Sequence, residues 1–237
     1  MHENTVALVT GANKGIGLAI ARELASRGLT VLLGARDASR GEVAAKGLAG
    51  DVRAITLDVT RADSIAAAAA RIGRELGRLD ILVNNAAIAV FGKPSAARLD
   101  DVRAVFETNV FGVIAVTQAM LPLLRAAPAG RIVNVSSRIG SLGAITDPAF
   151  AMRGIGGVVY GPSKTALNAV TVAFAQELEG TAIKVNLACP GHTATDLNGH
   201  NGPRTVFEAA REPVRLALVG PDGPTGTFSN DAGPIPW

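Results

Sequence analysis

Residues 6–17 read VALVTGANKGIG, a short apolar run followed by three closely spaced glycines. The run at 6–10 predicts a strand, and residues 16–26 predict a helix that follows it at once. Glycines at such a turn let the backbone approach a pyrophosphate, and the new helix directs its free N–H groups toward it. The stretch therefore predicts a dinucleotide-binding turn. Its glycines are Gly11, Gly15 and Gly17.

The spacing of these glycines, Gly-x3-Gly-x-Gly, differs from the common dinucleotide fingerprint, and taken alone it also fits a simple tight turn. A phosphate loop of the Walker type is excluded, because Lys14 precedes the second glycine and no Ser or Thr comes directly after it. The position directly after the first predicted strand favours the dinucleotide interpretation.

Apolar runs alternate with helical segments along the chain. Strands are predicted at 6–10, 30–33, 52–57, 80–84, 131–136, 183–187 and 227–229, and helices at 16–26, 40–48, 65–76, 102–124 and 163–178. Near-continuous apolar strands are typical of a parallel sheet covered on both faces. The sequence predicts an α/β fold, a doubly wound, Rossmann-like parallel sheet of about seven strands with helices on both faces. Residues 1–237 are expected to form a single dinucleotide-binding and catalytic domain.

The second predicted strand leads to Arg36, 19 residues beyond Gly17. An acidic residue at this distance holds the ribose 2′-hydroxyl of NAD, whereas an arginine accepts the 2′-phosphate of NADP. Lys14 would add a second cation. The alternatives are that both cations are solvated surface charges, or that Asp37 is the ribose acid; we expect Asp37 to begin the next helix instead. The pattern predicts NADPH or NADP as the cofactor.

Tyr160 and Lys164 are four residues apart, so on a helix they share one face. A nearby ammonium favours the phenolate and lowers the tyrosine pKa from about 10, which suits general acid–base catalysis. Tyr-x3-Lys alone is a weak motif. Tyr160 is, however, the only tyrosine in the chain, and it lies between the fifth predicted strand and the next helix. We predict that the two residues form the catalytic pair.

The composition excludes several classes of protein. The net charge is +3 and the cationic residues are scattered, so nothing indicates nucleic-acid binding. No uninterrupted apolar run reaches the ~18 residues of a membrane span. Cys189 is the only cysteine, which excludes an internal disulfide and fits a reducing compartment. We expect a cytoplasmic protein without nucleic-acid, membrane or metal partners.

Together these features resemble the short-chain dehydrogenase/reductase superfamily over essentially the whole chain. Further matching segments are Asp58-Val59, Asn84-Asn85-Ala86-Ala87, Asn109, Asn134-Val135-Ser136-Ser137 and Pro190-Gly191-His192-Thr193-Ala194-Thr195-Asp196. A closer likeness to carbonyl reductases is carried by Asn13-Lys14-Gly15-Ile16-Gly17, Ala35-Arg36-Asp37 and residues 228–237. Ala87 departs from the pattern, since the superfamily usually has glycine there.

The resemblance implies roles for individual residues. The implied catalytic residues are Asn109, Ser137, Tyr160 and Lys164. Ser137 would bind the substrate carbonyl, and Asn109 would hold a water that relays protons to Lys164. Asp58 would touch the adenine, and Thr195 would contact the nicotinamide carboxamide. The implied cofactor site comprises Gly11, Asn13, Lys14, Gly15, Ile16, Gly17, Arg36, Asp58, Val59, Asn85, Tyr160, Lys164, Pro190, Gly191, Thr193 and Thr195.

The implied activity is NADPH-dependent reduction of ketones or aldehydes, with Tyr160 as general acid. Two alternatives stay open: a dehydrogenase that works mainly in the oxidative direction, and a non-catalytic NADP(H)-binding regulator. The reductase would take a small hydrophobic carbonyl substrate, and the oxidative alternative differs in substrate and in direction.

Two segments interrupt the alternation of strands and helices, namely residues 138–159 and 190–204, and both follow strands at the ligand-binding edge. Apolar residues in the first predict a small hydrophobic substrate; they are Ile139, Leu142, Ile145 and Phe150. In carbonyl reductases a longer insertion between the Ser137 and Tyr160 positions covers a helix face that other members use to oligomerise. The intermediate length here leaves a monomer or a small homo-oligomer as the expectation.

Overall fold

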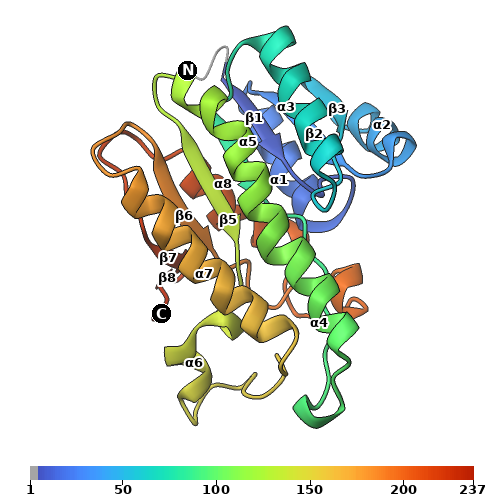
Figure 1. The fold of residues 1–237 in the computed structure, drawn as a ribbon, viewed down its shortest axis with the longest axis vertical. Helices are drawn as coiled ribbons and strands as arrows, with labels where there is room; N and C mark the ends of the chain where they lie inside the picture. The colour runs from blue at the N-terminus through green and yellow to red at the C-terminus, as the bar shows by residue number, and fades with distance from the viewer. Residues whose placement is uncertain (1–4) are drawn as a thin grey trace.

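The structure, a computed structural model, describes residues 5–237 and is built on a central sheet of eight strands in the order β3-β2-β1-β4-β5-β6-β7-β8 (Figure 1). The pairs from β3 through β7 are parallel, and β7 pairs with β8 antiparallel. The strands are β1 Val6–Val9, β2 Thr30–Ala35, β3 Val52–Thr56, β4 Ile81–Asn84, β5 Arg131–Val135, β6 Lys184–Ala188, β7 Phe228–Asn230 and β8 Gly233–Pro234. This confirms the predicted α/β fold.

Successive residues of the central strands point to opposite faces of the sheet, and both faces are buried. One core cluster contains Leu8, Leu32, Leu82 and Ile132, and the other contains their neighbours Val9, Leu33, Val83 and Val133. Two covered faces explain why these strands read as continuous apolar runs rather than as alternating ones.

Helices cover both faces of the sheet (Figure 1). The α-helices are α1 Gly15–Ser26, α2 Ala38–Lys46, α3 Ala62–Leu76, α4 Leu99–Phe106, α5 Gly112–Ala126, α6 Leu142–Thr146, α7 Tyr160–Glu177 and α8 Val206–Ala217. Ile20 of α1 and Val214 of α8 belong to one core cluster, while Ile72 of α3, Met120 of α5 and Ala175 of α7 belong to the other.

The helix predicted at 102–124 is composite. α4 and α5 are joined by a π-turn, η2 (Glu107–Phe111), and the backbone stays helical throughout. The combined helix Leu99–Ala126 is long and apolar enough to cross a membrane by length and composition alone. However, 44% of its apolar window is buried inside the fold, and the core helix of a globular domain meets the same criterion.

The sequence interpretation missed α6, which lies in the irregular segment 138–159, as well as α8 and β8. The signal for α8 was present, because Thr205 and Glu208 form a capping box: the Thr205 hydroxyl accepts from Glu208 N at 3.2 Å, and the Glu208 carboxylate accepts from Thr205 N at 2.8 Å. Pro213 lies inside this helix and weakens its pattern. The two-residue β8 brings the strand count to eight instead of about seven, and it carries no strand signal of its own.

Candidate active site

The parallel sheet collects the candidate residues at one edge. Many of them follow the carboxyl end of a strand, and in a doubly wound sheet these ends line the ligand crevice. The glycine turn follows β1, Arg36 follows β2, Asp58 follows β3, Asn85 follows β4, Ser137 follows β5 and Pro190 follows β6. The order of the strands therefore brings together residues that are up to about 180 positions apart in the chain.

Each glycine of the turn between β1 and α1 is required either by its backbone conformation or by lack of space for a Cβ. Gly11 and Gly15 have φ angles of +60° and +58°, a region that residues with a Cβ rarely adopt. A Cβ on Gly17 would lie 2.4 Å from the Asn85 amide nitrogen and 2.6 Å from the Gly11 carbonyl oxygen. The bare backbone at the start of α1 forms a cradle that suits a pyrophosphate.

Four hydrogen bonds, referred to below as the lock, connect this turn to the end of β4. The Asn85 side chain donates to the carbonyls of Thr10 at 2.9 Å and Gly11 at 3.1 Å. In return, the Thr10 hydroxyl accepts from the backbone N–H groups of Asn85 and Ala86, both at 3.0 Å. Thr10 was not among the predicted site residues, although it directly precedes the first glycine. The lock gives Asn85 a structural reason to be at this position.

Charged groups gather at the ends of β2 and β3. Arg36 is exposed, and its charge contributes to lowering the pKa of Asp58, although hydrogen bonds from Thr60 contribute more. Asp37 caps α2 by accepting from Arg40 N at 3.0 Å, as expected for a residue that begins a helix. An exposed guanidinium at the end of β2, with the adjacent acid used as a cap, suits a 2′-phosphate.

Lys14 has a partner that the sequence interpretation did not anticipate. Its ammonium lies 2.6 Å from the carboxylate of Asp196, which also binds His200 Nε2 at 2.8 Å. The pair joins the glycine turn to the loop that follows β6. Both partners are more than half exposed, so solvent screens the attraction and Lys14 can be shared with an incoming phosphate.

Tyr160 and Lys164 lie on one face of the first turns of α7, as their spacing predicts, and both are buried. The Lys164 ammonium donates to the Val135 carbonyl at 2.8 Å and lies 5.8 Å from the centroid of the Tyr160 ring. Pro162 fits the first turn of α7, where no i→i−4 hydrogen bond is lost.

The expectation that Lys164 lowers the pKa of Tyr160 is not met in the ligand-free protein. Burial raises the pKa of Tyr160, the Cys189 thiol acts in the same direction, and a hydrogen bond with Ser137 opposes them. Burial lowers the pKa of Lys164 to about 8. The physical reason is that both groups are desolvated, and desolvation disfavours each charged form more than their interaction can offset.

Asn109 lies in the π-turn η2 and is fully buried. Its amide accepts from Ile88 N at 3.0 Å and donates to Ile88 O at 2.9 Å and to the Ser163 hydroxyl at 3.1 Å. π-turns inside α-helices are frequent at functional sites. In this structure Asn109 connects the loop after β4 to the helix that carries Tyr160.

Ser137 is partly exposed beside Tyr160 and caps the short helix η3 (Arg138–Gly140). The neighbouring Arg138 donates its backbone N–H to the Cys189 sulfur at 3.2 Å. Burial raises the pKa of the Cys189 thiol, which disfavours the reactive thiolate. Cys189 is therefore a small buried residue next to the site.

An aromatic residue that the sequence interpretation missed, Phe91, covers Tyr160. The two ring centroids are 5.3 Å apart, and Phe91 remains 40% exposed. The loop of Phe91 also meets the segment before α7, because a Cβ on Gly157 would lie 2.6 Å from the Gly92 carbonyl oxygen. An apolar aromatic surface thus lies next to the phenol.

The predicted apolar lining of segment 138–159 is only partly available to a ligand. Ile139 is 6% exposed and packs inward, whereas Leu142 is 57% exposed on α6. Phe150 lies under the Arg138 guanidinium, 5.0 Å from its ring centroid. Ile145 is half-buried. The four residues do not form one continuous surface, because the segment folds into separate turns around α6.

The loop after β6 carries the last group of predicted residues. Gly191 adopts a φ of +77°, and the Thr193 hydroxyl binds the carbonyls of Pro190 and Gly191 at 3.3 and 3.2 Å. Thr195 caps the short helix η4 (Asp196–Asn198). The Thr195 side chain lies against the glycine turn, since a Cβ on Gly15 would lie 3.9 Å from the Thr195 methyl group.

Comparison with known proteins agrees with this geometry. Residues 5–205 match the family model described as short chain dehydrogenase. The chain is 40% identical over 222 residues to the short-chain dehydrogenase anuI of Penicillium roqueforti, covering 90% of this chain and 88% of that protein. It is 34% identical to carbonyl reductase [NADPH] 1 of Mus musculus over 98% of both chains.

Among solved structures, salutaridine reductase from Papaver somniferum superimposes with a TM-score of 0.83 at 30% sequence identity, covering 96% of this chain and 99% of that chain. The family match extends over most of the chain and the structural match over nearly all of it. The chain therefore belongs to the short-chain dehydrogenase/reductase family of oxidoreductases.

Proposed function

We propose that this chain is an NADPH-dependent reductase that converts hydrophobic ketones and aldehydes to alcohols, with Tyr160 as the general acid. The observation that carries the proposal is the position of Tyr160: it is hydrogen-bonded to Ser137 and one helical turn from Lys164, at the same sheet edge as the glycine turn. A proton donor and a dinucleotide cradle at one edge suit hydride transfer to a carbonyl.

The residues present fit the proposed cofactor. The cradle between Gly11, Gly15 and Gly17 would hold the pyrophosphate, and Arg36 with Lys14 would bind the 2′-phosphate. The remaining contacts would come from the residues predicted above. They are Asn13, Ile16, Asp58 and Val59 toward the adenosine half, Asn85 beside the active site, and Tyr160, Lys164, Pro190, Gly191, Thr193 and Thr195 toward the nicotinamide half. The relative named carbonyl reductase [NADPH] 1 supports the choice of NADPH.

In the proposed reaction Tyr160 donates its proton to the carbonyl oxygen, and its raised pKa keeps the phenol protonated at neutral pH. Ser137 donates a hydrogen bond to the same oxygen and stabilises the charge that develops there. Lys164, with a pKa of about 8, is mostly charged at pH 7 and would bind the nicotinamide ribose. Asn109 would complete the path that returns a proton to Tyr160. The bound cofactor supplies the hydride.

The proposed substrate is small and hydrophobic, because exposed apolar groups such as Phe91 lie beside Tyr160. Apolar pockets discriminate weakly, by about 1–3 kcal/mol per methylene, so several unrelated substrates are expected. We further propose that residues 1–237 act as one domain in the cytoplasm, as a monomer or small homo-oligomer, without nucleic-acid or membrane partners.

The test is incubation of the purified protein with NADPH and a panel of hydrophobic ketones and aldehydes, dicarboxylates and sugar phosphates, followed through NADPH absorbance. Consumption with several hydrophobic carbonyls is the expected result. Turnover only with alcohols and NADP would identify the oxidative dehydrogenase instead. Cofactor binding without turnover in either direction would identify a regulator. Strict specificity for one charged substrate would contradict the proposed substrate class.

A further inference from the structure

The loop that follows β6 has little regular structure to hold it. Between Pro190 and Thr205 it contains the three-residue helix η4 and one isolated bridge, between Thr193 and Arg204. Arg204 makes both backbone hydrogen bonds of the bridge: its N–H donates to His192 O at 3.3 Å, and its carbonyl accepts from Ala194 N at 3.0 Å. The backbone of Arg204 thus pairs with that of Thr193, in the segment proposed to contact the nicotinamide.

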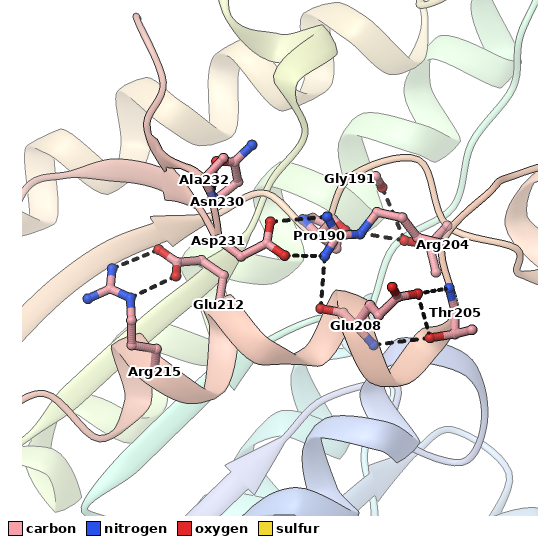
Figure 2. Close-up of polar contacts among 11 residues, drawn as sticks. Pro190, Gly191, Arg204, Thr205, Glu208, Glu212, Arg215, Asn230, Asp231 and Ala232 are labelled. Carbon is pink, nitrogen blue, oxygen red and sulfur yellow. Dashed lines mark hydrogen bonds and ion pairs between the residues drawn. The ribbon is translucent and has the colours of Figure 1, made fainter.

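The side chain of Arg204 fixes this segment to a distant part of the chain (Figure 2). Its guanidinium forms a two-pronged contact with Asp231, at 3.0 and 2.5 Å, and a further bond to the Glu208 carbonyl at 3.0 Å. Asp231 follows β7 in a turn that Asn230 orders by accepting from Ala232 N. Because β7 pairs with β6, the contact closes a ring from the end of β6 through the loop and back to the sheet.

The stem of Arg204 packs directly on Gly191. A Cβ on Gly191 would lie 2.7 Å from Arg204 Cδ and 3.2 Å from Nε, so the backbone of the loop rests against the side chain. Among the buried side-chain nitrogen and oxygen atoms of residues 5–237, Arg204 Nε is the one that has no hydrogen-bond partner. A buried donor left unpaired is unfavourable. The two-pronged contact and the packing on Gly191 must therefore outweigh this cost to keep the side chain in place.

The pair with Asp231 has the properties of a strong contact. The side chains of Arg204 and Asp231 are only 28% and 29% exposed, so water screens them less than it screens the surface pairs. Two parallel N–H···O contacts fix both distance and orientation, which a lysine cannot reproduce. Each carboxylate oxygen of Asp231 accepts from one terminal nitrogen of Arg204 (Figure 2), so the two residues define each other's position.

We propose that Arg204 is a positioning residue for the nicotinamide end of NADPH, an inference that rests on the proposed function. Through Asp231 it holds the backbone of Gly191 and Thr193 at the distance from the glycine turn at which the cofactor can be bound by both. The pair Lys14–Asp196 and the hydrogen bonds around η4 hold the middle of the loop, whereas the contact with Asp231 ties the Arg204 side to the end of β7. Without that contact part of the ordering falls to the cofactor, and its entropy is subtracted from the binding free energy. Arg204 touches neither reacting atom.

The experiment compares Arg204→Met, Arg204→Lys and Asp231→Asn with wild type. Methionine keeps an unbranched stem on Gly191 and removes the charge, while lysine keeps the charge and removes the two-pronged geometry. The control is Arg215→Met, which breaks a second two-pronged arginine–carboxylate contact, to Glu212 at 2.7 Å, outside the loop (Figure 2). Each variant is measured for its Kd for NADPH by fluorescence titration, for kcat with a hydrophobic ketone, and for Tm.

Arg204→Met and Asp231→Asn are each expected to raise the Kd for NADPH about tenfold, or about 1.4 kcal/mol. The double variant should be no worse than either single one, because both remove the same contact. Arg204→Lys should lie between them and wild type. Arg215→Met should lower Tm and leave the Kd within about twofold, a pattern that separates positioning from general loss of stability.

Equal Kd values for wild type and the folded Arg204→Met and Asp231→Asn variants would overturn the positioning role while leaving the proposed function intact. An equal rise in Kd for Arg215→Met would also overturn it, because destabilisation alone would then explain the effect. Wild-type protein that neither binds nor consumes NADPH would contradict the proposed function, and this inference with it.

Discussion

The cofactor side and the substrate side of the site are built by different means. On the cofactor side, the turn after β1 is fixed by three glycines and by Thr10 and Asn85, at the ends of two adjacent strands. On the substrate side, segment 138–159 depends on contacts with the end of the chain. The loop after β6, which is proposed to meet the nicotinamide between the two sides, depends on such a contact as well. The Ser141 hydroxyl donates to the Pro236 carbonyl, 95 residues away, and Arg204 reaches Asp231.

This difference suggests how each side responds to change. A turn in which each glycine is required by its conformation or by lack of space tolerates almost no substitution, and its conformation does not depend on the far end of the chain. Loops held by single long-range contacts can be rebuilt one contact at a time. The predictions below test whether cofactor binding and substrate handling separate in this way.

The sharpest test is Tyr160→Phe, because Tyr160 lies where the two sides meet. The change removes one hydroxyl and keeps the ring that packs on Phe91, so folding and the Kd for NADPH should be unchanged. Turnover should fall by about 10²–10⁴-fold, since the proton donor is lost. Kinetics with a ketone and a fluorescence titration with NADPH measure the two effects separately.

Lys164→Ala provides the contrast. It should weaken both turnover and NADPH binding, because the ammonium is proposed to serve the phenol and the ribose together. A Tyr160→Phe enzyme that keeps most of its activity would show that another group supplies the proton.

The second test concerns the cofactor side alone. Arg36→Ser should lower the preference for NADPH over NADH by about tenfold, which corresponds to about 1.4 kcal/mol and is within the range of an arginine–phosphate contact. Lys14→Ala should have a smaller effect, because Asp196 already neutralises Lys14 in the ligand-free protein. Arg40→Ser is the matched control: Arg40 is exposed in the first turn of α2 and pairs with Asp37.

Comparison of kcat/KM for the two nucleotides measures the preference. Wild-type protein that uses NADH and NADPH equally would show that Arg36 is a solvated surface charge.

The same contrast explains what could be predicted from the sequence. Strands buried on both faces and a glycine turn are local signals, so β1 to β7 were predicted to within a few residues, and Asp37 was correctly predicted to begin α2. Helix α8 was missed although its capping box was present. The pairs Lys14–Asp196 and Arg204–Asp231 were not predicted, because no local pattern specifies which distant carboxylate a loop cation will meet.

The pKa values of Tyr160 and Lys164 were the other feature that the sequence did not predict. The spacing of Tyr160 and Lys164 correctly placed them on one helical face, but spacing carries no information about burial. Burial raises the pKa of Tyr160 and lowers the pKa of Lys164. In water, a nearby ammonium would instead lower the pKa of the tyrosine. Burial of the start of α7 depends on the loops of the substrate side, including that of Phe91.

The third test uses the pKa of Lys164, about 8 against an ordinary value of 10.5. Lys164 is charged below pH 8 and loses its proton above it, so kcat/KM for NADPH, which reports the free enzyme, should fall about fivefold between pH 8 and 9. In Lys164→Met the profile should be flat over this range. A wild-type profile that is flat to pH 9 would show that the charge of Lys164 does not contribute to NADPH capture.

The sign of the stability effect provides a control. The folded-state pKa lies below the unfolded value, so between pH 8 and 10.5 the unfolded chain binds more protons. The contribution of Lys164 to stability therefore rises with pH in this window. Thermal unfolding at pH 8 and 9 should show no loss of stability from this group, so the fall in kcat/KM cannot be attributed to unfolding.

The smallest expected effect tests the substrate side alone, through removal of Pro236 and Trp237. Their carbonyl oxygens accept hydrogen bonds from the Ser141 hydroxyl at 2.5 Å and from Gly143 N at 2.6 Å, at the start of α6. Loss of these bonds should loosen α6 and raise the KM for a hydrophobic ketone about threefold, or roughly 0.7 kcal/mol, within the range of a net hydrogen bond. The Kd for NADPH should not change, because no residue of the glycine turn contacts this tail.

Trp237→Ala separates the two contributions of the tail. It keeps the backbone carbonyl and removes the indole, whose ring centroid is 6.0 Å from that of Phe228. If the backbone bonds to α6 are what matter, this variant should retain a near-wild-type KM while the truncated protein does not. If the truncation weakens NADPH binding as strongly as it raises the KM, the two sides of the site are coupled through the C-terminal strands. The separation between a fixed cofactor side and an adjustable substrate side would then be wrong.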